Sequence, residues 1–169
     1  YASRNENTYS LEELAEAGGE IAECTHKHPL GFLPASLLTV LLYKVVPMSV
    51  KQVQEEIDDI VADTLNILNC IYKGKYESDK RYLKELTEMA MLLAHSNISD
   101  ADAIRQLGEG WTAEETWAIA LFCAIRHIDS VENAIIASVN HDGDSDSTGS
   151  VCGNIMGAIY GYEHIKERN

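Results

Sequence analysis

Apolar residues recur at steps of three and four along most of the chain, and this spacing predicts helices. The longest stripe consists of Val53, Ile57, Ile60, Val61, Leu65, Leu68 and Ile71, and shorter stripes follow within 82–93 and 117–125. Because side chains three or four positions apart share one face of an α-helix, each stripe gives a helix one face to bury. No stretch shows the strict alternation typical of a strand, so the pattern predicts an all-α fold.

Residues that begin and end helices lie between these stripes. Capping-box patterns, in which a hydroxyl can accept from a free amide of a first helical turn, occur at Ser10–Glu13, Ser49–Gln52, Ser99–Asp102 and Thr112–Glu115. We expect Pro34 in the first turn of a helix that ends before Pro47, and Gly74 to stop the helix that carries the longest stripe. The sequence therefore predicts about eight helices in a compact bundle, with residues 1–169 forming one domain.

Composition narrows the possible partners and the compartment. The formal net charge is −14, which repels phosphate backbones, so we expect no nucleic-acid partner. No apolar run is long enough to cross a bilayer, so we expect no membrane partner. The four cysteines, Cys24, Cys70, Cys123 and Cys152, are widely spaced in apolar helical contexts. They predict buried free thiols in a reducing compartment, and we expect a cytoplasmic monomer.

An acidic loop interrupts the helical pattern at 140–149. Asp142, Asp144 and Asp146 alternate there, and Ser147 follows. Clustered carboxylates repel each other unless a cation lies among them, and hard oxygen ligands suit Mg²⁺, Mn²⁺ or Ca²⁺. The spacing alone is equally consistent with a solvated turn whose aspartates cap the next helix. A calcium loop of the EF-hand type is excluded, because its glycine and glutamate positions hold Ser147 and Gly153.

The segment after this loop carries glycine at every fourth position. Gly149, Gly153, Gly157 and Gly161 would share one face of a helix. Each glycine inside a helix costs roughly 1 kcal/mol relative to alanine. Four at this spacing predict that another helix packs close to this face, with the electropositive helix N-terminus facing the aspartates.

Three segments together resemble one protein family. The run NHDGDSDSTG at 140–149, followed by GNIMGA at 153–158, closely resembles the C-terminal signature of the ADP-ribosylglycohydrolases. That family includes the dinitrogenase reductase-activating glycohydrolases. The run THKHP at 25–29 and the run LGEGW at 107–111, followed by AEE at 113–115, resemble two further segments of the family. The resemblance covers about 11–161 in family order.

The resemblance implies a fold, an activity and a set of ligands. The fold would be the family's all-α bundle, and the activity would be hydrolysis of the glycosidic bond linking ADP-ribose to a protein side chain or a small molecule. Two divalent cations, Mg²⁺ or Mn²⁺, would be held partly by Asp144, Asp146 and Ser147, with Asp146 between the ions and Asp142 not a ligand. His26 matches a histidine of the family's ADP-ribose pocket, although a structural role is equally open. The 108–110 loop would line the pocket through its backbone.

The family's N-terminal motifs are missing from this sequence. A Gly-Asp opening motif and a Thr-Asp-Asp motif supply the other metal ligands and the acidic base in the family, so no catalytic residue is assigned here. Glu12-Glu13 and Asp58-Asp59 are interpreted as solvated helix faces. We therefore expect the C-terminal part of a longer domain that alone binds metal weakly and is inactive. The alternatives are a non-catalytic ADP-ribose-binding or metal-binding module, or a related enzyme acting on another glycoside or amide-like substrate.

Overall fold

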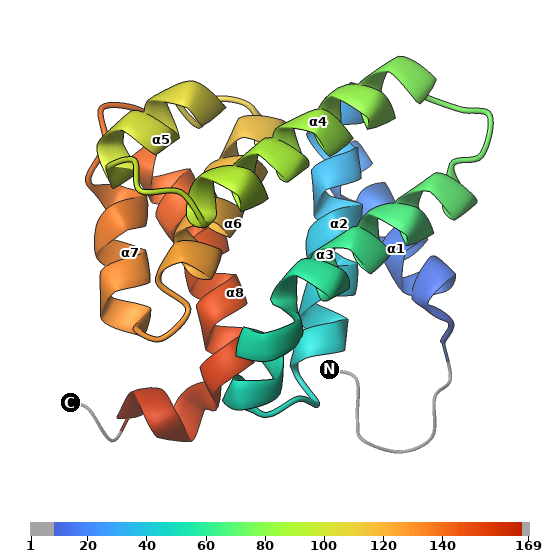
Figure 1. Ribbon diagram of the computed structural model, residues 1–169. Coiled ribbons are helices and arrows are strands. Elements are labelled where there is room, and N and C mark those ends of the chain that lie inside the picture. The colour runs from blue at the N-terminus through green and yellow to red at the C-terminus, as the bar shows by residue number, and fades with distance from the viewer. Residues whose placement is uncertain (1–8, 167–169) are drawn as a thin grey trace.

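The computed structural model of the chain describes residues 9–166, and within that range it contains eight helices and no strand (Figure 1). The helices are α1 (Leu11–Glu23), α2 (Pro29–Val45), α3 (Val50–Ile71), α4 (Glu77–Ala94), α5 (Asp100–Leu107), α6 (Ala113–Arg126), α7 (Val131–Val139) and α8 (Ser145–Lys166). The all-α prediction is confirmed. Within the described range, no helix combines the length and the apolar character that a membrane span requires.

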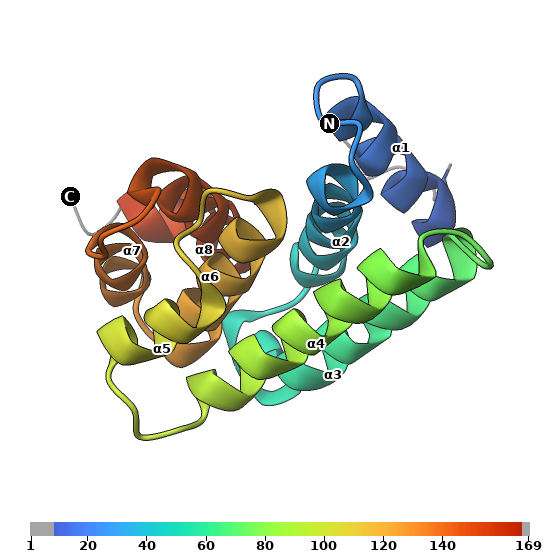
Figure 2. The ribbon, with the colours of Figure 1, turned by 90° about the horizontal axis from the view of Figure 1, so that it is seen from above.

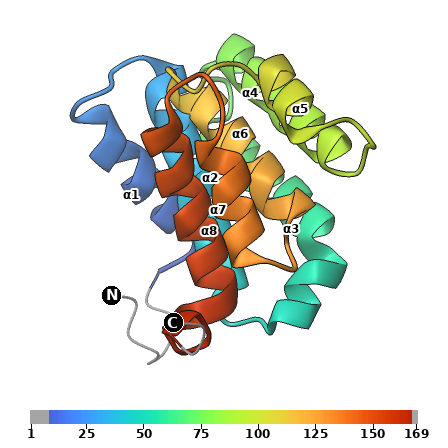
Figure 3. The same ribbon diagram turned by 90° about the vertical axis from the view of Figure 1, so that its left-hand side faces the viewer.

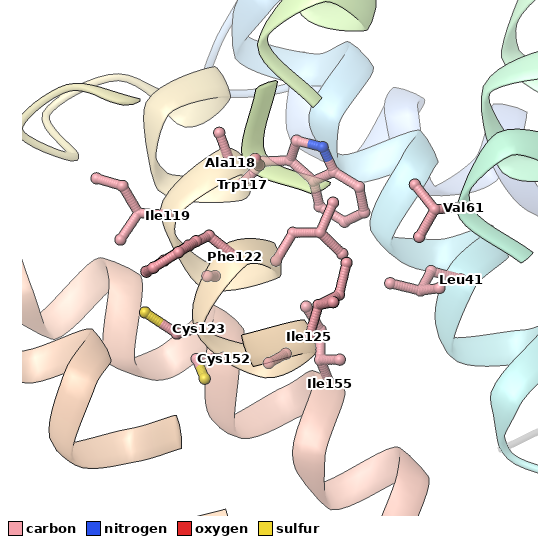
Figure 4. Packing of buried hydrophobic residues seen from close by; sticks show 14 of the residues in the cluster. Leu41, Val61, Trp117, Ala118, Ile119, Phe122, Cys123, Ile125, Cys152 and Ile155 are labelled. Carbon is pink, nitrogen blue, oxygen red and sulfur yellow. The ribbon is translucent and has the colours of Figure 1, made fainter. Parts of the chain in front are cut away.

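Helix α6 forms the centre of the bundle. Every residue from Thr116 to Ile125 is buried, and the helix packs against α2, α4, α5, α7 and α8. Figure 2 shows α3 and α4 side by side along one edge, with α1 beside α2 above them and α7 and α8 at the left. In Figure 4, Cys123 of α6 lies beside Cys152 of α8. This packing holds α6 and α8 in a fixed relation, and both helices begin at the same end of the bundle.

Helix α2 begins earlier than the sequence predicts. Its first residue is Pro29, and the Nδ1 atom of His28 accepts a hydrogen bond from the N–H of Leu30 at 3.2 Å. Pro34 therefore lies inside the helix, and the expectation that it occupies the first turn is wrong. The reason is that an imidazole takes the capping role usually held by a short hydroxyl or carboxylate side chain. The predicted end before Pro47 is confirmed, since the helix ends at Val45.

The capping predictions hold at three of the four places. Ser10 and Ser49 form complete capping boxes with Glu13 and Gln52, and Ser99 accepts a hydrogen bond from the N–H of Asp102. At the start of α6, in contrast, the Thr112 side chain makes no capping hydrogen bond. Its expected partner, Glu115, turns away from the helix terminus toward the preceding loop.

The expectation that all four thiols are buried is half wrong. Cys123 and Cys152 are buried between α6 and α8, and burial raises the pKa of both thiols, that of Cys152 to about 11. Cys24 and Cys70 are exposed. Cys24 follows the last residue of α1, and Cys70 lies on the outer side of α3, so neither position faces the core.

The glycine face of α8 packs closely only near its N-terminus. A Cβ at Gly149 would lie 2.5 Å from Cγ1 of Val139, and one at Gly153 would lie 3.7 Å from Cδ1 of Ile135. A Cβ at Gly157 would meet no atom within 4 Å, and Gly161 breaks the helix with a φ of 74°. The prediction of close packing along the whole face is therefore wrong beyond the second glycine.

Replacing Gly157 with alanine is expected to raise the free energy of unfolding by about 0.5–1 kcal/mol, because helix propensity improves and nothing obstructs the added methyl group. Gly149→Ala is expected to gain less, because the Val139 side chain must move to admit the methyl group. Urea denaturation of the two variants and the parent chain measures the difference. A Gly157→Ala variant less stable than the parent would contradict this description of α8.

Candidate functional site

Three connections between helices meet at one end of the bundle (Figure 3). They are the α1–α2 connection at 24–28, the α5–α6 connection at 108–112 and the α7–α8 connection at 140–144. Together with the first turns of α2, α6 and α8 they enclose a cleft of about 970 Å³. Side chains with chemistry in its lining include His26, Lys27, His28, Trp111, Glu114, Asp144, Asp146 and Ser147. The cleft is therefore built from segments far apart in the sequence.

The same geometry directs three helix N-termini at the cleft. Helices α2, α6 and α8 all begin in its lining. A helix N-terminus carries a partial positive charge and free backbone N–H groups, which favour anions. Lys27 adds a full positive charge to the lining. In a chain of net charge −14, this cleft is thus a place where an anionic ligand can be accommodated.

The structure brings together all four residues that the sequence singled out. Asp144, Asp146 and Ser147 lie in one wall of the cleft, and His26 lies in its lining, contributed by the α1–α2 connection. The imidazole Nδ1 of His26 is 2.8 Å from the Thr25 hydroxyl, and the ring is exposed. Asp142 is exposed and does not line the cleft. His26 and the acidic loop can therefore contact one ligand.

The two carboxyl groups at the start of α8 affect each other. The pKa of the Asp144 carboxyl is lowered, chiefly because the Asp146 carboxyl shares a hydrogen bond with it and secondarily because of the Ser147 hydroxyl. Neighbouring carboxylates repel each other when both are ionised. A divalent cation bound beside them would offset that repulsion.

Close contact between two loops holds the acidic residues in place. The N–H of Asp144 donates to the carbonyl of Glu109 at 2.7 Å. At Gly143, a Cβ would overlap with that same carbonyl and the backbone around it. Glycine at 143 suggests a residue that lets the backbone turn. In the structure, glycine is required because two backbones touch here and leave no room for a side chain.

The residues that support the α5–α6 connection were not predicted from the sequence. The Glu115 carboxylate accepts hydrogen bonds from the N–H groups of Glu109 at 3.2 Å and Gly110 at 3.0 Å. Thr116 donates its hydroxyl to the carbonyl of Gly110 at 2.8 Å. The only signal in the sequence was the capping-box spacing of Glu115, which pointed to the wrong partner. Glu114, also overlooked, lies in the cleft wall with 9% of its surface exposed.

The donor set fits part of a site for a hard cation. Two carboxylates and a hydroxyl are oxygen ligands, which Mg²⁺ and Mn²⁺ prefer. Among the described residues, however, no group of three or more histidine, cysteine, aspartate or glutamate side chains is arranged to hold a metal ion. The described residues therefore supply some of the six oxygens that Mg²⁺ requires and leave the others to water or to groups outside this set.

Comparison with known proteins identifies the family. The model of the ADP-ribosylglycohydrolase family matches residues 4–169, and the chain belongs to this family. Similar curated proteins include the ADP-ribosylhydrolase ARH3 of Homo sapiens, which is 23% identical over 174 residues, and that of Gallus gallus, which is 24% identical over 175 residues. Each match covers 94% of this chain and 47% of the relative, so the chain spans about half their length. No solved structure matches the chain significantly.

Proposed function

We propose that this chain forms the C-terminal half of a metal-dependent hydrolase that cleaves the glycosidic bond between ADP-ribose and a protein side chain or a small molecule. The observation that carries the proposal is the cleft, which joins Asp144, Asp146 and His26 to three helix N-termini. Membership of the ADP-ribosylglycohydrolase family supports the same reaction. The net charge of −14 supports a monomer that binds neither nucleic acid nor anionic membranes. We also propose that it acts on such conjugates in the cytoplasm.

The two kinds of charge in the cleft suit different parts of ADP-ribose. Its pyrophosphate is an anion that the N-terminus of α2 would bind, because the first turn of α2 has no acidic residue, with Lys27 beside it and His26 able to donate a hydrogen bond. The carboxylates at the start of α8 would repel the pyrophosphate, so they must face another part of the substrate. That part is the ribose at the scissile bond, which carries hydroxyl groups and no charge.

Asp144, Asp146 and Ser147 would hold the divalent cations, Mg²⁺ or Mn²⁺, of which we propose two. When bound, the two cations would orient the ribose hydroxyls and a water molecule and lower the pKa of that water. The chain's own contribution is to fix the position of the anomeric carbon, through the helix N-termini at one side and the α8 carboxylates at the other. None of the residues described here is assigned as the acidic base, which we place outside this chain.

A second function is binding of ADP-ribose without turnover. The observation that favours it is that the described residues contain no group of three or more acidic, histidine or cysteine side chains arranged to hold a metal ion. Under this alternative, the cleft would bind ADP-ribose through the helix N-termini and would release nothing.

Mass-spectrometric assay of the full-length protein separates the two functions. The substrates are ADP-ribosyl-arginine, ADP-ribosyl-serine and O-acetyl-ADP-ribose, each with Mg²⁺, with Mn²⁺ and with excess EDTA. The proposal predicts release of ADP-ribose from at least one substrate, and loss of that release in EDTA. Binding of ADP-ribose without release from any substrate would support the binding module and overturn the hydrolase.

A further inference from the structure

His141 lies at the start of the acidic loop and makes two hydrogen bonds with it. The N–H of Gly143 donates to its Nδ1 atom at 3.1 Å, and its Nε2 atom is 2.9 Å from the hydroxyl of Thr148. The ring therefore connects the turn before Asp144 to the first turn of α8. Neither contact was predicted from the sequence, in which His141 is only one residue of the motif at 140–149.

These contacts determine which ring nitrogen carries the proton. Because Nδ1 accepts from a backbone N–H, it has no proton of its own in this arrangement, so the neutral ring carries its proton on Nε2. Nε2 then donates to the Thr148 hydroxyl. That hydroxyl in turn donates a hydrogen bond to the carbonyl of Ser138 at 2.7 Å. Each hydrogen bond from Gly143 through His141 and Thr148 to Ser138 then has one donor and one acceptor. Only the tautomer with the proton on Nε2 satisfies this arrangement.

Thr148, at the other end of this series of hydrogen bonds, is held firmly by its surroundings. Thr148 is fully buried and its hydroxyl oxygen also lies within 3.3 Å of the carbonyls of Asp144 and Ser145. Its methyl group lies in contact range of Gly110, in the loop across the cleft. His141 thus connects the turn at 142–144 to a buried residue of α8.

We propose that His141 is a positioning residue for the cation-binding carboxylates, a role that rests on the function proposed above. Two successive amides of the turn are held from opposite sides. His141 holds the N–H of Gly143, and the carbonyl of Glu109 holds the N–H of Asp144. With both amides fixed, the Asp144 side chain leaves the backbone in one direction. Hydrogen-bonded partners of this kind keep metal ligands oriented without touching the metal.

Two variants separate positioning from general stability. His141→Ala removes both hydrogen bonds, whereas His141→Asn places an amide oxygen near the position of Nδ1 and keeps an acceptor for Gly143. Titration of the full-length protein with Mn²⁺, followed by electron paramagnetic resonance, is expected to show affinity reduced about 10–100-fold in the alanine variant. The asparagine variant should recover most of it. His127→Ala, which loses a comparable contact with Asp100 away from the cleft, should leave Mn²⁺ affinity unchanged.

The tautomer offers a readout that does not depend on metal or turnover. Long-range ¹H–¹⁵N spectra of this chain should show His141 protonated on Nε2 and unprotonated on Nδ1. A proton on Nδ1, unchanged Mn²⁺ affinity in His141→Ala, or an asparagine variant no better than the alanine variant would each overturn the proposed role. If the Mn²⁺ affinities and the tautomer are as expected but no substrate is hydrolysed, the proposed function is contradicted and the positioning role of His141 is not.

Discussion

Replacing Asp146 with alanine in the full-length protein is expected to abolish hydrolysis of every substrate that the parent cleaves. The side chain lies in the cleft wall with Asp144, and it would be a ligand of the bound cations. Its loss removes charge stabilisation worth several kcal/mol in the transition state, which corresponds to a decrease of roughly 10³-fold in kcat. Steady-state kinetics at saturating Mg²⁺ or Mn²⁺ measures the effect.

Asp142→Ala is the matched control for this variant. Asp142 belongs to the same loop and carries the same charge, but it is exposed and lies outside the cleft lining. Its replacement should leave kcat within about twofold of the parent. Retained activity in Asp146→Ala would remove the basis for the metal assignment. Equal losses in the two variants would show that the acidic loop acts only through its overall charge.

Gly143→Ala should disable the site while the bundle stays folded. The added methyl group would overlap with the backbone of Glu109, so the two loops must separate and the hydrogen bond between Asp144 N–H and the Glu109 carbonyl is lost. A lost hydrogen bond of this kind costs about 1–3 kcal/mol of stability. Displacement of the carboxylates by about 1 Å costs on the order of 10²-fold in turnover. Urea denaturation and kinetics on the same preparations measure both losses.

Gly153→Ala tests whether any added methyl group in this region would act in the same way. Its Cβ would meet Ile135 at 3.7 Å, an ordinary contact, about two turns into α8. This variant should keep its turnover and should be at least as stable as the parent, because alanine has the better helix propensity. If Gly143→Ala behaved like Gly153→Ala, the contact between the loops would have no part in placing the carboxylates.

The sequence predicts the fold well because the helices are encoded locally. The stripe from Val53 to Ile71 became α3, with Val53, Ile57 and Val61 buried as the spacing requires. The start of α2 was missed for a local reason too, since the His28 imidazole caps the helix where a serine or aspartate was expected. Helix boundaries fail where a side chain takes an uncommon role, while helix identity follows from periodicity.

The site was predictable only in part, because it depends on contacts between distant segments. Resemblance to the family singled out Asp144, Asp146, Ser147 and His26, and the structure places all of them at one cleft. Nothing in the local sequence indicates that Glu115 would hold the backbone of Glu109, or that Glu109 would hold Asp144. Such supports become visible only when α6 and α8 are packed together.

A cation site formed by residues at the start of α8 can be tested by line broadening in ¹H–¹⁵N spectra of this chain, because Mn²⁺ broadens the signals of the residues nearest to it. We expect the backbone signals of Asp144, Asp146 and Ser147 to broaden first, together with that of Gly110 across the cleft. The control is the acidic groove that contains Glu56, Asp59 and Asp63, which should respond only at much higher Mn²⁺. Broadening that begins in that groove, or that follows acidic residues evenly over the surface, would contradict a specific cation site at the start of α8.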